Sequence, residues 1–320
     1  MYIFIKPIHK KLFHTSFQSR KPTHTMELKI KNLNKTYSNG VQALKDVTLD
    51  IPQGMFGLLG PNGAGKSSLM RTLATLQQAD SGSVLLDNLD ILNEKAEVRK
   101  ILGYLPQEFG VYPKVSSYNM LNHIASLKGI SNHGERKVLV ESLLNKTNLW
   151  HVRNKNLGTY SGGMKQRFGI AQALVGDPKL IIVDEPTAGL DPAERNRFHN
   201  LLCEIGENTI VILSTHIVDD ISNLCNNMAI ICSGEVVLKG NPTDLTDGVK
   251  GRVWTKAIEK NELENYQMEF KVISTHLKAG KTVIHVLNDN PPDATFKAFE
   301  ANLEDVYFAE ITDRMNTTLV

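Results

Sequence analysis

The spacing of apolar residues predicts short strands where the folded region begins. From Met26 to about Ile51, apolar and polar residues alternate around Leu28, Ile30 and Leu33, and the turn Ser38-Asn39-Gly40 interrupts them. A period of two is the pattern of a half-buried β-strand. We therefore expect an antiparallel β region at the N-terminal end of the fold.

Largely apolar runs alternate with helical patterns through the middle of the chain. They occur at Met55–Leu59, Leu180–Val183 and Thr209–Leu213. Strands that are apolar on both faces and alternate with helices indicate a mostly parallel sheet covered on both sides. Ligands of such sheets bind at the carboxyl ends of the strands. The polar side chains that follow these runs should therefore meet at one edge.

A polar, helical region lies between the first of these runs and the second. Strand patterns at Val84–Leu92 and Ile101–Leu105 come first, and from about Tyr118 to Leu157 the pattern is helical with no strong strand. Helices inserted between strands of one sheet predict a separate helical subdomain, which we place at about 108–160.

The sequence changes character at the end of the main domain, which we place at residues 26–243. Beyond it, Phe270–Ile273 and Val283–Leu287 predict a hairpin, and a helix is expected from about Ala294. No chemical motif is found in this part. We therefore expect residues 244–320 to form a small α/β appendage.

The first stretch, Met1–Thr25, carries five basic residues and no acid, and its apolar patch Tyr2–Ile5 is too short for a secretory signal. One interpretation is a transit-like leader. The other is a disordered extension, or an upstream start codon before a natural start at Met26. We favour the second interpretation, because strand-like alternation begins only at Met26.

Charge, cysteine content and hydropathy exclude several classes of protein. Lys plus Arg number 36 and Asp plus Glu 34, a formal net charge of +2, which argues against a nucleic-acid partner. The three cysteines form no Cys-x-x-Cys pair, which argues against a zinc site and a disulfide framework and fits a reducing compartment. No apolar run approaches the roughly 20 residues that cross a bilayer. We expect a chain that is soluble by itself and reaches a membrane only through a partner.

One loop carries the strongest chemical signal, because three glycines surround a single lysine and two hydroxyls follow. It reads Gly60, Pro61, Asn62, Gly63, Ala64, Gly65, Lys66, Ser67, Ser68. Glycines let successive N–H groups point into one concave nest, lysine adds a compact cation, and a hydroxyl can ligate magnesium. The predicted strand before the loop and the predicted helix after it are the context that a phosphate-binding loop requires.

Acids and a second glycine nest complete the chemistry. Asp184 and Glu185 end a buried strand, where one carboxylate can hold magnesium and the other can polarise an attacking water. The sequence Tyr160-Ser161-Gly162-Gly163-Met164 opens a predicted helix, and a hydroxyl with two glycines at a helix N-terminus forms an anion site. Only the first nest holds a lysine. This asymmetry suggests that the second nest contacts a phosphate already held by another copy.

The chain resembles the ATP-binding subunit of an ABC transporter over about residues 26–243. The motifs that carry the resemblance stand in the family's order: GPNGAGKSS (Walker A), Gln107 in YLPQEFG, YSGGM (signature), LIIVDEP (Walker B), AGLDP with Asp191 (D-loop) and His216 in LSTH (switch). The resemblance implies an α/β P-loop NTPase core with a mostly parallel sheet, together with the antiparallel, helical and C-terminal parts described above. It also implies ATP and Mg²⁺ as cofactors.

The resemblance also implies roles residue by residue. Residues Gly60 to Lys66 wrap the β-phosphate, with Lys66 reaching the β- and γ-phosphates, and Ser68 follows in the same loop. The adenine base stacks on Tyr37, and Mg²⁺ lies near Ser67, Gln107 and Asp184. Glu185 is the general base and His216 senses the γ-phosphate. Ser161 and Gly163 close on the nucleotide of a second, head-to-tail subunit, and Gly162 and Asp191 also belong to the nucleotide-binding set.

Two departures from the family pattern lie in the signature, where Tyr160 replaces the commoner leucine and Met164 replaces glutamine. The serine and both glycines are kept, so the anion contact should survive. YSGGMKQR and the ending LEDVYF resemble the exporter-type group, whose permease is a separate chain. The subunit would then lie at the cytoplasmic face of the membrane, peripheral through that permease. The alternative is a soluble ABC ATPase acting on the ribosome or on DNA. The short interval between Walker A and signature and the single copy of each motif argue against it.

Overall fold

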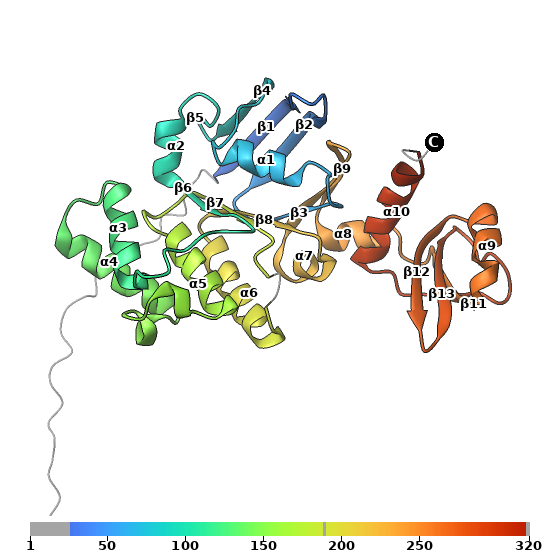
Figure 1. Ribbon diagram of the computed structural model, residues 1–320. Helices are drawn as coiled ribbons and strands as arrows, with labels where there is room; N and C mark the ends of the chain where they lie inside the picture. Colours follow the sequence, from blue (N-terminus) through green and yellow to red (C-terminus); the bar gives the residue numbers. More distant parts are fainter. Residues whose placement is uncertain (1–25, 188–189, 318–320) are drawn as a thin grey trace, which may run out of the picture.

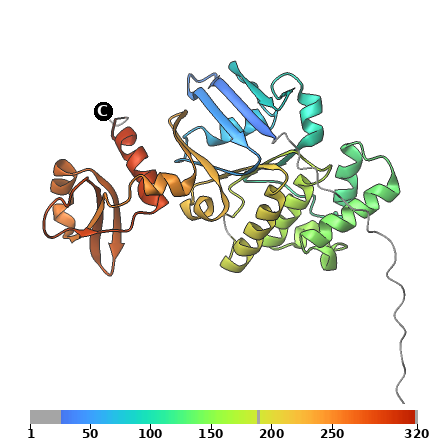
Figure 2. The same ribbon diagram turned by 180° about the vertical axis from the view of Figure 1, so that it is seen from behind.

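The structure is a computed structural model that describes residues 26–187 and 190–317 (Figure 1). The leader predicted at residues 1–25 lies outside the described residues. The described chain forms an N-terminal antiparallel sheet, a central sheet with helices, a group of helices beside it, and a C-terminal unit joined through helices α8 and α10 (Figures 1 and 2).

The N-terminal sheet follows from the alternation of apolar and polar residues. Its strands, in the order β2-β1-β4-β5, are β1 (Glu27–Thr36), β2 (Gln42–Pro52), β4 (Ser81–Leu86) and β5 (Leu89–Asp90). Every pairing in this sheet is antiparallel, and Leu28 lies opposite Ile51 on one side and Leu86 on the other. All three side chains are buried. The sheet therefore turns one apolar face toward the core, as the period of two predicts.

The central sheet has six strands in the order β10-β9-β3-β8-β7-β6, and all its pairings are parallel except that of β10 with β9. The strands are β3 (Gly54–Leu59), β6 (Leu102–Leu105), β7 (Leu180–Asp184), β8 (Ile210–Thr215), β9 (Asn227–Cys232) and β10 (Glu235–Gly240). Every residue of β7 and β8 is buried. The prediction of a mostly parallel sheet is confirmed, and its inner strands are covered on both sides.

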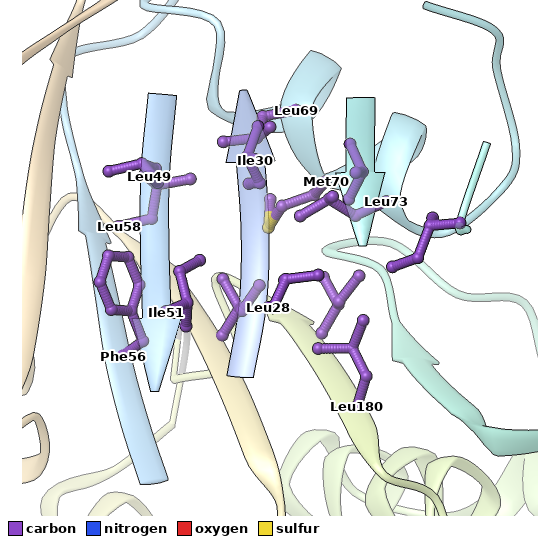
Figure 3. Packing of buried hydrophobic residues seen from close by; sticks show 14 of the residues in the cluster. Leu28, Ile30, Leu49, Ile51, Phe56, Leu58, Leu69, Met70, Leu73 and Leu180 are labelled. Atoms are coloured by element: carbon purple, nitrogen blue, oxygen red, sulfur yellow. The ribbon is translucent and has the colours of Figure 1, made fainter. Parts of the chain in front are cut away.

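Successive side chains of the central strands belong to two separate cores. Phe56 and Leu58 of β3 pack with the N-terminal sheet, as Figure 3 shows, whereas Met55 and Leu59 pack on the opposite face. Helix α1 contributes Leu69 to the first core. The helices that accompany this sheet are α1 (Lys66–Leu73), α2 (Lys95–Ile101), α5 (Gly162–Ala173), α6 (Pro192–Gly206), α7 (Val218–Leu224) and α8 (Pro242–Asp247).

The inserted helical region has a core of its own. It consists of α3 (Ser117–Leu127), α4 (His133–Lys146) and two 3₁₀ turns, η1 (Trp150–Val152) and η2 (Leu157–Thr159). Ser116 and Asn132 cap the two helices by accepting hydrogen bonds from backbone N–H groups of the first turn. Leu121, Leu144 and Phe168 are buried together, so α5 joins this region to the central sheet.

The C-terminal unit is built on a second antiparallel sheet, in the order β12-β13-β11-β14. Its elements are β11 (Val253–Ile258), η3 (Lys260–Glu262), α9 (Leu263–Glu269), β12 (Val272–Lys278), β13 (Lys281–Leu287), β14 (Lys297–Ala298) and α10 (Leu303–Thr317). The predicted hairpin is present, and its turn residues Ala279 and Gly280 both have positive φ.

The helix expected from Ala294 begins only at Leu303, so that prediction is wrong. Phe296 is buried against the sheet of the C-terminal unit, and the edge strand β14 pairs Ala298 with Trp254. These tertiary contacts hold the segment as a turn at Ala294 and Thr295 followed by the short strand β14. The Asn302 side chain then accepts hydrogen bonds from the backbone N–H groups of the residues that open α10.

Candidate active site

A cavity of about 850 Å³ lies at the carboxyl end of the central sheet. Its lining residues come from six separate segments: Tyr37, Val41, Gln42, Ala43, Lys45, Pro61, Asn62, Gly63, Ala64, Gly65, Lys66, Ser67, Ser68, Gln107, Glu185, His216 and Ser233. The glycine loop follows β3, Glu185 follows β7, and His216 follows β8. The prediction that these strand ends meet at one edge is therefore confirmed.

Close backbone contacts require glycine at two positions of the loop, Gly60 and Gly65. A Cβ on Gly60 would lie 2.2 Å from the carbonyl oxygen of Ile231, and one on Gly65 would lie 2.4 Å from that of Ala43. Gly65 also has a φ of 109°, which L side chains rarely adopt. It precedes α1, whose N-terminus has no side-chain cap. None of the residues in the first turn of α1 is acidic, so its free N–H groups suit an anion.

Lys66 lies beneath this loop and is 7% exposed. Its Nζ donates to the carbonyl oxygens of Gly60 at 2.5 Å and Pro61 at 3.1 Å. Burial lowers the pKa of Lys66, and the carboxylates of Glu185 and Asp184 oppose that shift. The ammonium group is thus a partly desolvated cation, which favours partners that carry full negative charge.

Asp184 ends β7 and Glu185 follows it, and the two acids lie in different environments. Asp184 is 7% exposed and lies below the cavity lining, and burial raises the pKa of its carboxyl group. Glu185 lines the cavity and has a φ of 46°, in the left-handed region. Its Oε2 accepts from Gln107 Nε2 at 3.2 Å, and its Oε1 lies 3.1 Å from His216 Nδ1. Three residues that the sequence singled out are therefore in direct contact.

Tyr37 forms the open side of the cavity and is 36% exposed. Its hydroxyl lies 3.0 Å from Ser68 Oγ and donates to Gln77 Oε1 at 3.1 Å. Two polar contacts with α1 and the segment after it thus hold the ring beside the glycine loop. The ring is available to a planar apolar group at the mouth of the cavity.

The second glycine nest lies elsewhere. Among the described residues, the cavity lining includes neither Ser161, Gly162 and Gly163 nor Asp191. Ser161 caps α5 by accepting from Met164 N at 3.2 Å. Asp191 caps α6 in the same way, accepting from the backbone N–H of the third helical residue at 2.8 Å. The structure therefore does not bring these four residues to the cavity of their own chain.

Sequence reasoning missed five lining residues: Val41, Gln42, Ala43, Lys45 and Ser233. None belongs to a chemical motif. They reach the site through backbone pairing, because Lys45 N bonds the carbonyl of Gly234 at 2.8 Å and Gly234 N bonds that of Ala64 at 2.9 Å. The Ser-Gly turn between two apolar strands was the only sequence signal, and it predicts a hairpin rather than a site.

The residues present fit a nucleotide with a hard divalent cation. Ser67 offers a hydroxyl oxygen, and Gln107 keeps its amide oxygen available because Nε2 donates to Glu185. Among residues 26–187 and 190–317, no three His, Cys, Asp or Glu side chains gather as metal ligands. Mg²⁺ in nucleotide sites takes only one or two carboxylates and completes its shell with phosphate and water oxygens. The oxygen donors around the glycine loop are of that kind.

Comparison with known proteins agrees with this geometry. The family model described as ABC transporter matches residues 44–188. The chain is similar to the uncharacterized ABC transporter ATP-binding protein YxlF of Bacillus subtilis, with 33% identity over 84% of this chain and 86% of that protein. It is also similar to the linearmycin resistance ATP-binding protein LnrL of the same organism, with 34% identity over 70% and 72% of the two chains.

Solved structures show the same fold. A dimeric ATP-binding cassette in a post-hydrolysis state, bound to ADP and Pi, matches with a TM-score of 0.61 and 28% identity, covering 67% of this chain and 98% of that one. Other relatives are much longer. The chain spans 30% of the ABC transporter A family member 8 of Dictyostelium discoideum and 28% of member 7 of Arabidopsis thaliana. Within the part of the chain that the structure describes, no helix has the length and hydropathy to cross a membrane.

Proposed function

We propose a function that starts from one fact: this chain belongs to the family of ABC transporter ATP-binding proteins. The chain binds ATP in the cavity at the carboxyl end of the central sheet and hydrolyses it. Hydrolysis drives a transport step in a separate membrane permease. One observation carries this proposal: Glu185, Gln107 and His216 converge on the cavity that the glycine loop and Lys66 enclose.

The glycine loop and α1 hold the phosphates. Backbone N–H groups of the loop and the N-terminus of α1 point toward the β-phosphate, and the helix dipole favours its negative charge. Lys66 Nζ then donates to phosphate oxygens in place of the carbonyls of Gly60 and Pro61. These oxygens replace the solvation that the ammonium group loses on burial. The base of ATP stacks on Tyr37 at the mouth of the cavity.

The residues at the ends of β7 and β8 carry the chemistry. Glu185 accepts a proton from the attacking water, and His216, 3.1 Å from its Oε1, contacts the γ-phosphate. Gln107 orients the Glu185 carboxylate through its 3.2 Å hydrogen bond. When bound, Mg²⁺ neutralises charge on the phosphates, and the oxygens that would hold it belong to Ser67, Gln107 and Asp184.

The proposed transport function involves two partner chains. A transmembrane permease provides the membrane spans, and the chain lies at the cytoplasmic face through it. The Ser161 nest closes on the nucleotide of a second ATP-binding subunit in a head-to-tail dimer. The direction is export: the YSGGMKQR and LEDVYF sequences resemble the exporter-type group, and the LnrL relative is named for resistance.

Phosphate release by the purified chain with Mg-ATP tests the catalytic part of the proposal. Glu185→Gln keeps the size of the side chain but removes the base, so the rate should fall by about 10²–10⁴-fold while ATP still binds. Glu264→Gln, an exposed acid on α9, is the matched control and should hydrolyse at the parent rate. A Glu185→Gln variant as active as the parent would contradict the role of general base. Co-purification of a permease from membranes tests the transport part.

A further inference from the structure

A fully buried carboxylate lies behind the candidate active site. Asp220, on α7, is 0% exposed. Its Oδ2 accepts from Thr187 Oγ1 at 2.8 Å and from Thr215 Oγ1 at 3.4 Å. Its Oδ1 accepts from Arg195 Nη2 at 2.6 Å and Nε at 2.9 Å, and His199 Nε2 lies 2.9 Å away. A buried charge is costly unless it is paired and hydrogen-bonded, and both oxygens of this carboxylate have partners.

The partners of Asp220 lie in three segments next to residues of the proposed nucleotide site, namely the ends of β7 and β8 and the start of α6. Thr187 lies two residues after Glu185, and Thr215 directly precedes His216. Arg195 lies in the first turns of α6, the helix that Asp191 caps. One oxygen of the carboxylate thus accepts hydrogen bonds from hydroxyls near the ends of β7 and β8. The other accepts from a guanidinium group on α6. The same buried carboxylate thus connects α6 with Thr187.

The backbone of Glu185 needs such an anchor. A residue other than glycine with a φ of 46° is strained, and this conformation persists only where the surroundings fix it. On the N-terminal side, Glu185 N donates to the carbonyl of Ser214 at 2.8 Å. On the C-terminal side, the bond from Thr187 to Asp220 fixes the chain two residues later. Both anchors connect the β7 end to the segment that begins at β8.

We propose that Asp220 is a positioning residue for ATP hydrolysis. It acts through Thr187 to hold Glu185 in its strained conformation, and through Arg195 to connect that conformation to α6. The inference rests on the proposed role of Glu185 as general base. Because Asp220 and Thr187 do not line the cavity, their loss should slow the chemical step and leave ATP binding intact.

Two substitutions at Thr187 test this role without placing an uncompensated charge in the core. Thr187→Val keeps the shape and removes the hydroxyl, and it should lower kcat by about 10- to 100-fold, since small misplacement of a reacting group has effects of that size. KM for ATP, and ATP affinity measured without Mg²⁺, should stay within about twofold. Thr187→Ser restores the hydroxyl and should restore most of kcat.

Thr147→Val is the matched control. Thr147 is 1% exposed, and its hydroxyl donates to the Leu143 carbonyl at 2.8 Å in the helical region. It should lower the thermal midpoint about as much as Thr187→Val, with kcat unchanged. A parent-like kcat in Thr187→Val beside an inactive Glu185→Gln would overturn the positioning role and leave the proposed function standing. Failure of Thr187→Ser to restore kcat would also overturn it. A fully active Glu185→Gln would remove the proposed function and this inference together.

Discussion

Replacing Tyr37 by alanine should weaken ATP binding far more than replacing it by phenylalanine. The ring is 36% exposed at the mouth of the cavity, so alanine removes a stacking surface and leaves little of the core disturbed. Aromatic stacking contributes on the order of 1–3 kcal/mol per base in nucleic-acid binders. At about 1.4 kcal/mol per tenfold change, the Kd for ATP should rise by about 5- to 150-fold.

Phenylalanine separates the ring from its hydroxyl. Tyr37→Phe keeps the stacking surface and loses the hydroxyl contacts with Ser68 at 3.0 Å and Gln77 at 3.1 Å. Because both contacts are exposed, each should contribute near the low end of the usual range, about 0.5 kcal/mol. We therefore expect Tyr37→Phe to raise the Kd by no more than about fivefold. Tyr37→Trp, which enlarges the ring, should bind ATP about as well as the parent.

Calorimetric titration of ATP without Mg²⁺ measures these affinities apart from turnover. Tyr112→Ala is a suitable control, because this tyrosine is 65% exposed and does not line the cavity. Its Kd should match that of the parent. Equal Kd values for Tyr37→Ala and the parent would refute the stacking role and leave Tyr37 as a packing residue. A loss in Tyr37→Phe as large as that in Tyr37→Ala would assign the effect to the hydroxyl instead.

Three further predictions concern stability, the leader and assembly. Because burial raises the pKa of Asp184, its ionised form is disfavoured in the fold, and Asp184→Asn should raise the melting temperature of the nucleotide-free protein at neutral pH. That gain should shrink as the pH falls through the raised pKa, and it should vanish below the ordinary pKa of a carboxyl group. If Asp184→Asn has the melting temperature of the parent throughout this pH range, the argument is wrong. A chain started at Met26 should keep the melting temperature and ATPase rate of the full chain, and a marked loss of either would show that the leader contacts the fold. Cysteines at the exposed positions Asn62 and Gly162, with the native cysteines replaced, should form a disulfide between chains on a non-reducing gel, more so with ATP in a hydrolysis-deficient background. A disulfide formed only within one chain would exclude the head-to-tail dimer.

Sequence reasoning located the candidate site because its chemistry lies at strand ends. Lys66, Glu185 and His216 each follow an apolar run, and parallel strands bring their carboxyl ends to one edge. The lining residues without a motif, such as Ala43 and Ser233, could not be found in this way. They enter the cavity through backbone pairing between strands that are distant in sequence, which residue types do not record.

Burial of polar groups was the second feature that the sequence did not reveal. Asp220 lies in the first turn of α7 next to a second aspartate, a pattern typical of a solvated helix start. Its burial depends on Arg195 and Thr187, which tertiary packing brings to it. The late start of α10 has the same origin, because burial of Phe296 overrides the helical pattern that begins near Ala294. Contacts between residues distant in sequence thus determine both the burial of Asp220 and the start of α10.

The two glycine nests differ in a way that bears on assembly. The first nest surrounds Lys66 in a cavity, whereas the second is exposed at Ser161 and Gly162, and a Cβ on Gly162 would meet no atom within 4 Å. Near the second nest, the Arg167 guanidinium lies 3.3 Å from the Glu194 carboxylate, so its charge is already paired. Helix N–H groups bind an anion weakly by themselves, but they add to a site where the anion is already held. We therefore infer that the second nest completes a site whose lysine belongs to another copy of the chain.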